Sequence, residues 1–263
     1  MALVVTPAVV LRTYRYSETS KIVRLATREC GVQSAMAKGA LRPNSRFGVG
    51  LELLSEGTAQ LYYRDNRELQ TLAAFDVELL RRELAADLGR FAAATALAEL
   101  MMRMAPPAPL PAAYDALTGG LDALVGASPA DVDAAGIRAL WLLLGVLGFE
   151  PSLRRCAHDG VPVEVDGAPV PFSGAEGGVL CDTCASGIPP ASRTRLPAVA
   201  WRDLCTLVDP DASLPRLDAA HAAAHKRLAA RFARHHLDDQ GAGSLPALEF
   251  WERRAWGQPP AAS

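Results

Sequence analysis

The pattern of apolar and polar positions divides this chain into a β-rich first part and a helical remainder. Up to about residue 75, short runs rich in Val, Ile, Thr and Tyr alternate with polar turns, which is typical of strands. These runs lie at 3–16, 21–27, 32–37, 51–64 and 69–75. Strands this short suit a small closed barrel better than an open sheet, because closure leaves no exposed edge.

From about Asp76 onward the apolar residues recur three and four positions apart, in stretches rich in Ala, Leu, Glu and Arg. This spacing predicts helices. We expect them at 77–104, 111–125, 130–148, 197–208 and 215–237. The proline-rich stretch 105–111 ends the first helix, because proline lacks the N–H that a helix interior needs.

A segment rich in Gly, Pro and Val interrupts the helical part and carries most of the cysteines. The predicted fold is therefore α+β and multidomain, with a β-barrel followed by an all-α domain that contains a small insertion. The expected bounds are 1–77 for the barrel, 78–150 and 191–255 for the helical domain, 151–190 for the insertion and 256–263 for a flexible tail.

Composition limits the class of protein. Half of the 263 residues are apolar, which is enough for a packed core and excludes global disorder. No run approaches the roughly 18 apolar residues of a membrane span, and the first residues lack the pattern of a signal peptide. We therefore expect a cytoplasmic protein without a membrane partner, in which clustered cysteines are metal ligands or catalytic groups rather than disulfides.

Positive charge gathers near the start of the chain. The formal net charge is only −2. Between Arg12 and Arg46, however, eight basic residues stand against Glu18 and Glu29, which gives 8 − 2 = +6 locally and leaves about −8 for the rest. The average thus hides a basic N-terminal face.

Three of these cations occur four residues apart in AKGALRPNSRFG, namely Lys38, Arg42 and Arg46. The glycines and the proline of this stretch predict a loop that follows a strand. A loop with three cations at the mouth of a barrel would follow a phosphate backbone, and nearby tyrosines offer faces for bases. These are Tyr14, Tyr62 and Tyr63. The alternative is a solvated basic face with tyrosines in the core.

The cysteine segment contains one complete zinc-knuckle turn, Cys181-Asp182-Thr183-Cys184, which follows a Gly-Gly pair. The second turn begins at Cys156 and ends in a glycine, but its other ligand is irregular. His158 is chemically the better zinc ligand, whereas Asp159 occupies the regular spacing. The segment predicts structural zinc, and the alternative is a degenerate knuckle that folds without metal.

Other chemistry is not supported by the sequence. No βαβ unit surrounds the C-x-x-C pair, which disfavours a redox role, and no H-x-E or H-E-x-x-H arrangement indicates catalytic zinc. No nucleotide-binding or serine-hydrolase motif occurs. His221 and His225 are expected to be solvated or capping residues. A second basic cluster is expected to be a solvated face, or else to extend a DNA track; it comprises Lys226, Arg227, Arg231 and Arg234.

Several segments in order along the chain resemble the RecO family of bacterial recombination mediators. They are YSETSKIVRLATRECG (16–31), AKGALRPNSRFG (37–48), GFEPSLRRC (148–156), FSGAEGGVLCDTC (172–184) and LPALEFW (245–251). The resemblance covers nearly the whole chain, and its specificity lies in the order and spacing of the pieces.

The resemblance implies an N-terminal OB-fold, a helical C-terminal domain and, in many members, a zinc-binding, zinc-ribbon-like insertion. It implies binding of single- and double-stranded DNA, annealing of complementary strands, and partnership with RecR and the C-terminal tail of single-stranded-DNA-binding protein. It further implies a bacterial, nucleoid-associated protein of the RecF pathway that helps load recombinase and is not an enzyme.

Carried over by position, the resemblance makes Lys38, Arg42 and Arg46 the DNA-contacting cations, with Lys21 and Arg24 on a neighbouring strand. It makes the three cysteines of the insertion metal ligands, while Asp159 stands where other members have a fourth cysteine. Two other classes remain open: a protein-interaction adaptor whose DNA contact is incidental, and a metal-dependent hydrolase acting on nucleic acid.

Overall fold

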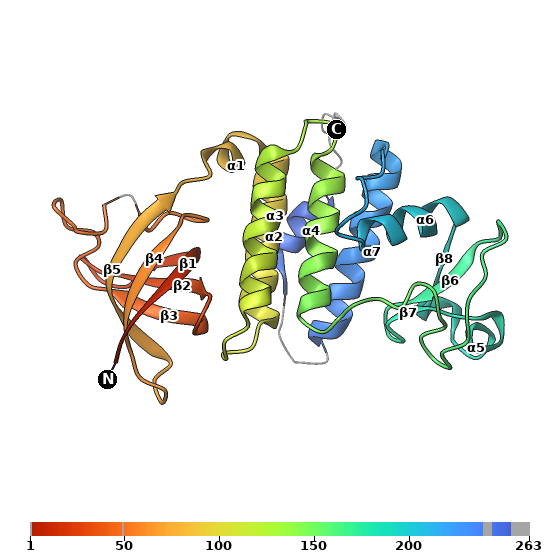
Figure 1. Cartoon of the computed structure of the whole chain (residues 1–263), viewed down its shortest axis with the longest axis horizontal. Helices are drawn as coiled ribbons and strands as arrows, with labels where there is room; N and C mark the ends of the chain where they lie inside the picture. Colours follow the sequence, from red (N-terminus) through yellow and green to blue (C-terminus); the bar gives the residue numbers. More distant parts are fainter. Residues whose placement is uncertain (1, 49, 239–243, 254–263) are drawn as a thin grey trace, which may run out of the picture. The chain divides into compact units, whose positions relative to one another are not determined.

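The computed structural model describes residues 2–48, 50–238 and 244–253 (Figure 1). The chain forms two compact units, Met1–Val125 and Gly126–Ser263. The predicted domain bounds stay predictions, and the predicted tail at 256–263 lies outside the described residues.

The first unit begins with the expected five-stranded sheet, and this prediction is confirmed. Its strands are β1 (Ala2–Arg15), β2 (Lys21–Thr27), β3 (Gly31–Ala37), β4 (Glu56–Tyr63) and β5 (Leu69–Leu79). They close into a barrel in the order β1-β2-β3-β5-β4. All neighbouring pairs are antiparallel except β3 and β5, which are parallel.

The barrel is filled by the alternate residues of its strands. Val23 and Leu25 of β2 point inward, and Ala35 of β3 pairs directly with Val23 and is also buried. Successive side chains of a strand point to opposite faces, so this alternation separates the core from the outer surface. Phe47 and Leu51 reach into the same core from the loop between β3 and β4.

The prediction of a strand over 51–64 is wrong in its first part. Residues 51–55 form turns, and β4 begins only at Glu56. Leu54 adopts a left-handed conformation, with φ of 66°, which a strand does not accommodate. Its N–H still donates a hydrogen bond to the Val10 carbonyl at 2.8 Å. The apolar residues of 51–55 therefore pack a loop against the barrel and do not form a strand.

The prediction of one helix over 77–104 is also wrong in its first part. β5 continues through Leu79, α1 is a short helix at Arg82–Ala86, and α2 spans Leu88–Met104. The break has a local cause: the Asp87 side chain accepts hydrogen bonds from the N–H groups of Gly89 and Arg90. Aspartate at this position starts a new helix, because it satisfies donors that have no partner within the helix.

A buried arginine joins the barrel to α3 (Pro111–Gly126) within the first unit. Arg81 donates to Glu56 at the start of β4 at 2.5 Å and to Asp122 of α3 at 2.8 Å. These two carboxylates raise the pKa of Arg81 against the effect of its burial. The charge is therefore compensated on both sides, as a buried cation requires.

The second unit contains helices and a small three-stranded sheet. Its elements are α4 (Val132–Val146), β6 (Val170–Ser173), β7 (Gly178–Val179), α5 (Asp182–Ser186), a 3-10 turn (Pro190–Ser192), β8 (Thr194–Leu196), α6 (Ala198–Leu207), α7 (Ala219–Asp238) and α8 (Pro246–Arg253). The sheet has the order β7-β6-β8. The helix predicted from 215 begins at Ala219, because the Asp218 side chain caps it by accepting from the His221 N–H at 2.9 Å.

The core of the second unit is aromatic and contains one buried ion pair. The Phe232 ring of α7 lies 5.1 Å from the Trp141 ring of α4 and 6.1 Å from the Phe172 ring of β6. Lys226 is buried and contacts Asp133 at 2.5 Å. No helix in the described parts of the chain combines the length and apolarity that a membrane span requires.

Candidate nucleic-acid interface and metal centre

The loop after β3 is fixed to the end of the barrel by its backbone. The Leu41 N–H bonds the Thr19 carbonyl at 2.9 Å, and the Gly39 N–H bonds the Ser20 hydroxyl at 3.4 Å. Gly39 has φ of 74°, a conformation that glycine adopts without steric cost. The loop is therefore tied to the β1–β2 turn.

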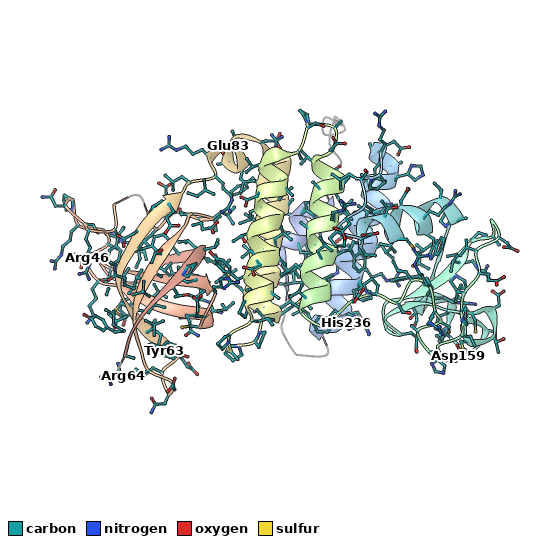
Figure 2. All side chains as sticks on the ribbon, in the orientation of Figure 1. Arg46, Tyr63, Arg64, Glu83, Asp159 and His236 are labelled. Atoms are coloured by element: carbon teal, nitrogen blue, oxygen red, sulfur yellow. The ribbon has the colours of Figure 1, made fainter. Side chains whose placement is uncertain are left out.

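One aromatic side chain holds the middle of this loop against the barrel. Phe47 is buried in the barrel core, and the neighbouring Arg46 guanidinium carbon lies 5.1 Å from the centre of its ring. Figure 2 shows Arg46 at the rim of the barrel. The apolar anchor and the cation next to it together present positive charge at a fixed place.

The three predicted loop cations are exposed. Lys38, Arg42 and Arg46 all lie on the segment between β3 and β4, and none of them makes an ion pair with another described residue. Cations without carboxylate partners create a positive potential that attracts polyanions. The arrangement suits binding of a phosphate backbone without reading of base sequence.

Lys21 lies beside this loop, together with an arginine that the sequence did not single out. In the register of the barrel, Lys21 pairs with Arg15 on one side and with Ala37, the residue before Lys38, on the other. Lys21, Arg15 and Lys38 therefore lie at the same end of the barrel. Arg15 belonged to the basic run in the sequence, but only strand pairing could place it here.

Arg24 lies elsewhere on the barrel. It pairs with Arg12 and Ser34 across the strands, is half-buried, and donates to the Ser34 hydroxyl at 2.8 Å. Burial lowers the pKa of Arg24, the charge of Tyr14 opposes this, and Arg103 lowers it further. The structure thus separates Arg24 from the loop cations.

Two of the candidate tyrosines are accessible to bases. Tyr14 is 44% exposed and Tyr62 is 40% exposed. Tyr63 is half-buried, and burial is the largest cause of its raised pKa. The Arg12 guanidinium lies 5.1 Å from the centre of the Tyr14 ring. Tyr14 and Tyr62 therefore remain available as stacking surfaces, and Tyr63 is less so.

The second unit brings four of the predicted metal ligands together. The ligand atoms of Cys156, Asp159, Cys181 and Cys184 all lie within 4.8 Å of one another. The Cys184 thiol donates to Asp159 Oδ2 at 3.1 Å and the Cys181 thiol lies 3.5 Å from the same oxygen. Figure 2 marks Asp159 in this group.

Two tight turns produce this geometry. In the first, the Gly160 N–H bonds the Cys156 carbonyl at 2.8 Å, and Gly160 has φ of 76°. In the second, the Cys181 sulfur caps α5 by accepting from the Cys184 N–H at 3.4 Å. The two turns therefore bring the side chains at positions 156, 159, 181 and 184 to one place.

Hydrogen bonds between the thiols and Asp159 dominate the electrostatics of the group. Hydrogen bonds from the Cys184 and Cys156 thiols and from the Val161 N–H lower the pKa of Asp159 to about 2. The bond to Asp159 raises the pKa of Cys184. Burial acts to raise the pKa of Cys156, but backbone N–H groups, including that of Cys181, outweigh it and lower that pKa.

The donor set fits zinc. Three thiols and one carboxylate are common zinc ligands, and in a tetrahedral site with Zn–S bonds of about 2.3 Å the sulfurs lie about 3.8 Å apart. The four ligand atoms, within 4.8 Å of one another, reach that spacing with small side-chain rotations. The group could therefore hold a metal ion.

His158, the other candidate for the fourth ligand, lies outside the group. Its side chain is exposed, and its Nδ1 forms a hydrogen bond with Glu176 Oε2 at 3.0 Å. The turn from Cys156 to Gly160 directs position 159 toward the sulfurs, so of the two candidates for the fourth ligand the structure brings only Asp159 into the group.

Comparison with known proteins finds matches to both halves of the chain. Residues 1–79 match the family described as "Recombination protein O N terminal", and residues 85–246 match "Recombination protein O C terminal". The chain is 38% identical over 183 residues to "DNA repair protein RecO" of Anaeromyxobacter dehalogenans, which covers 69% of this chain and 70% of that protein.

A second relative comes from a different genus. The chain is 37% identical over 186 residues to "DNA repair protein RecO" of Symbiobacterium thermophilum, with 70% of this chain and 72% of that protein covered. The family matches together span most of the chain. The chain therefore belongs to the RecO family of DNA repair proteins.

Proposed function

We propose that this protein is a non-enzymatic mediator of recombination that binds DNA and anneals complementary strands. The observation that carries the proposal is the group of exposed cations on one anchored loop, Lys38, Arg42 and Arg46, none of which pairs with a described carboxylate. Annealing needs the backbone charge neutralised while the bases stay free to pair, and lysine and arginine do this for any sequence.

We further propose that the barrel is an OB-fold that carries single-stranded DNA across its basic end. OB-folds are five-stranded barrels that combine a positive groove with stacking aromatic residues. The strand order β1-β2-β3-β5-β4 and the exposed Tyr14 and Tyr62 support this reading. Lys21 extends the basic end, with Arg15 as its cross-strand neighbour.

The metal centre has a structural role in this proposal. Zinc bound by Cys156, Asp159, Cys181 and Cys184 would fasten two turns that pack on a small buried cluster of Cys156, Leu180 and Ala185. Small segments with so little core commonly depend on a metal for their fold.

The partners in this proposal follow from the family resemblance. They are single- and double-stranded DNA, RecR and the C-terminal tail of single-stranded-DNA-binding protein. Support comes from the relatives, which are named as DNA repair proteins. In this role the protein would help load recombinase onto coated single strands.

A protein-interaction adaptor is the second candidate. Leu3, Val5 and Tyr62 are 52%, 58% and 40% exposed, and Leu3 pairs directly with Tyr62 across β1 and β4. An exposed apolar group of this kind on a sheet can serve as a docking surface. An adaptor would need neither the loop cations nor DNA.

Fluorescence anisotropy with labelled single-stranded and duplex DNA separates the two candidates. We expect the wild-type protein to bind both at about 50 mM salt and to weaken steeply at about 200 mM, because binding releases counterions. Changing Lys38, Arg42 and Arg46 to Ala should weaken binding for every sequence. It should also reduce the salt slope for single strands by about 2, since each phosphate contact contributes about 0.7.

The matched control removes the same charge elsewhere. Arg82, Arg202 and Arg216 are exposed and lie outside the barrel, so their triple change to Ala should keep most of the affinity. Equal affinity of the loop variant and the wild type at both salt concentrations would contradict the DNA-binding proposal and favour the adaptor.

A further inference from the structure

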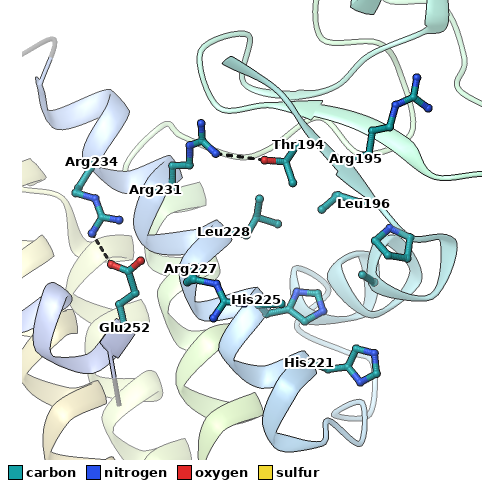
Figure 3. Close-up of a pocket in the computed structure, with 13 residues that line it drawn as sticks. Thr194, Arg195, Leu196, His221, His225, Arg227, Leu228, Arg231, Arg234 and Glu252 are labelled. Atoms are coloured by element: carbon teal, nitrogen blue, oxygen red, sulfur yellow. Dashed lines mark hydrogen bonds and ion pairs between the residues drawn. The ribbon is translucent and has the colours of Figure 1, made fainter. Parts of the chain in front are cut away.

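A cavity in the second unit has no role in the proposed function. It has a volume of about 400 Å³ and lies among β8, α6, α7 and the last turn of α8 (Figure 3). Leu196 of β8 and Leu228 of α7 contribute apolar lining, and several arginines contribute positive charge. A cavity with both kinds of lining suits a ligand that has an apolar and a charged part.

The charge of the lining is strongly positive. Four arginines and one glutamate line the cavity, which gives 4 − 1 = +3: Arg195, Arg227, Arg231, Arg234 and Glu252. The single carboxylate is already used, because Arg234 donates to Glu252 at 2.7 Å. Arg195 and Arg227 make no ion pair within the described parts of the chain.

Arg231 is held in place without being neutralised. Its guanidinium donates to the Ala191 carbonyl at 2.8 Å and lies 3.4 Å from the Thr194 hydroxyl, both of which are neutral acceptors. Figure 3 shows this contact at the upper edge of the cavity. A cation that is oriented but not compensated is prepared for an anionic ligand.

A buried histidine supplies the second observation. His225 lines the cavity and is only 2% exposed, yet neither of its ring nitrogens has a hydrogen-bond partner among the described residues. Its neighbour His221 is bonded to Asp218. Buried polar groups are normally hydrogen-bonded, since an unpaired one costs free energy. His225 therefore offers a donor that the protein itself leaves unused.

We propose that this cavity binds a terminal phosphate group, either of a free nucleotide or of a DNA 5′ end. A phosphate monoester carries a charge of about −1.5 to −2 and three acceptor oxygens, which match the excess of cations and the free imidazole. An internal phosphodiester has a single charge and continues as chain on both sides. A carboxylate also has only one charge.

The two leucines of the cavity have a role in the same proposal. Leu196 and Leu228 would cover the sugar or base that follows the phosphate. The nucleotide source is independent of the DNA-binding proposal, whereas the 5′-end source rests on it. The shared chemistry is the monoester, and the two sources are separated by experiment.

Two measurements on the full-length protein test the site. The first compares oligonucleotides with a 5′-phosphate and a 5′-hydroxyl by anisotropy, and the second titrates thymidine 5′-monophosphate and thymidine by calorimetry. We expect the phosphorylated member to bind about tenfold more tightly, because hydrogen bonds to a charged group are worth about 1.5–3 kcal/mol.

Substitutions test whether the preference for the phosphorylated probe arises at this cavity. Arg227 is exposed, so Arg227→Ala should remove the phosphate preference without loss of folding, and Arg227→Lys should restore part of it. Arg216→Ala, an exposed change outside the cavity lining, should keep the preference. Circular dichroism of each variant confirms that a lost preference is not a lost fold.

The outcomes separate this proposal from the proposed function. A 5′-phosphate preference that survives removal of the loop cations supports the DNA-end source, and thymidine monophosphate binding alone supports the free nucleotide. If the wild-type protein binds thymidine monophosphate but no DNA, only the proposed DNA-binding function is contradicted. If neither probe distinguishes phosphate from hydroxyl, the cavity is not a phosphate site.

Discussion

The barrel and the cysteine segment place their functional groups differently with respect to their cores. The barrel encloses twelve buried residues, and its candidate DNA-binding cations lie outside that cluster. The hydrophobic cluster beside the metal ligands has three buried residues, of which one, Cys156, is itself a candidate metal ligand. In one region function is added to a completed fold, and in the other the ligands belong to the core.

This difference predicts opposite responses to substitution. Charges on a surface that does not hold the fold are removable at small cost to stability. Metal ligands that form part of a core cannot be removed at small cost, because the free energy of metal binding then contributes to the free energy of folding.

The largest effect is expected from Cys156→Ser. Structural zinc contributes on the order of 10 kcal/mol of apparent binding energy in small domains, and Cys156 is the buried member of the ligand group. The variant should lose bound zinc and the protection of backbone amides over 151–196, as should the wild type treated with chelator. Elemental analysis and hydrogen exchange measure both.

The control for this change is Cys205→Ser, since Cys205 is half-buried and lies outside the ligand group. It should keep its zinc and its amide protection. Zinc-free wild-type protein with full protection over 151–196 would show that hydrogen bonds alone hold the segment, which is the degenerate-knuckle alternative.

The next effect concerns the loop anchor rather than its charges. Phe47→Ala should destabilise the protein by about 3–5 kcal/mol, because it leaves a cavity in the barrel core. It should also weaken DNA binding, since Arg46 loses the ring beneath it. Thermal unfolding and anisotropy report the two effects. Arg46→Ala is the matched control and should affect DNA binding alone.

Asp159 should have a smaller effect than a cysteine ligand. Replacing it with Ala should weaken zinc binding and leave three thiols, whereas Asp159→Cys should strengthen it. Competition with a chromophoric chelator measures the zinc affinities of the two variants and the wild type. Equal affinity of Asp159→Ala and the wild type would exclude the carboxylate from the ligand set.

Acid release of the metal provides a sharper test of the same residue. Without metal, hydrogen bonds, chiefly from the Cys184 thiol, lower the pKa of Asp159 from 3.8 to about 2, so its contribution to stability is complete above pH 3.8 and is lost as the pH falls toward 2. A carboxylate bound to zinc is also deprotonated, so of the four ligands only the thiolates should take up protons when zinc is released between pH 7 and 4. Asp159→Cys should steepen the pH dependence of zinc release by one proton.

The loop cations should have almost no effect on stability. Changing Lys38, Arg42 and Arg46 to Ala removes no described ion pair, and surface substitutions of this kind are usually within about 0.5 kcal/mol. Circular dichroism should give the wild-type melting temperature for the same variant that loses DNA affinity. A large drop would mean that the loop charges help to hold the barrel.

Apolar periodicity predicted the regular strands and helices correctly. It gave wrong bounds where a single side chain or a loop contact determines where an element begins. The strands at 21–27 and 69–75 and the helices α3, α4 and α6 follow from period alone. Residues 51–55 are apolar but serve as loop packing, and Asp87 divides a helical pattern by capping. Neither event changes the apolar period, so periodicity could not reveal it.

The candidate sites show the same limit. The loop cations were evident from their spacing, but Arg15 joins them only through the register of β1 and β2. The choice between His158 and Asp159 depends on the direction of one turn, which composition does not encode. The unpartnered His225 was expected to be a solvated or capping residue, because burial of its helix face is a tertiary property.

The smallest effect is expected at His158, and it tests the contrast most closely. If the ligands form the core of this region, a side chain that lies two residues from Cys156 in sequence but points away from the sulfurs should not affect the metal. His158 is exposed and bonded to Glu176 at 3.0 Å, an interaction worth about 0–1 kcal/mol at a surface. His158→Ala should therefore keep the zinc content and the amide protection of the wild type. Loss of zinc in this variant would mean that the turn reorganises around the ion, and the ligand set would then be His158 with the three cysteines.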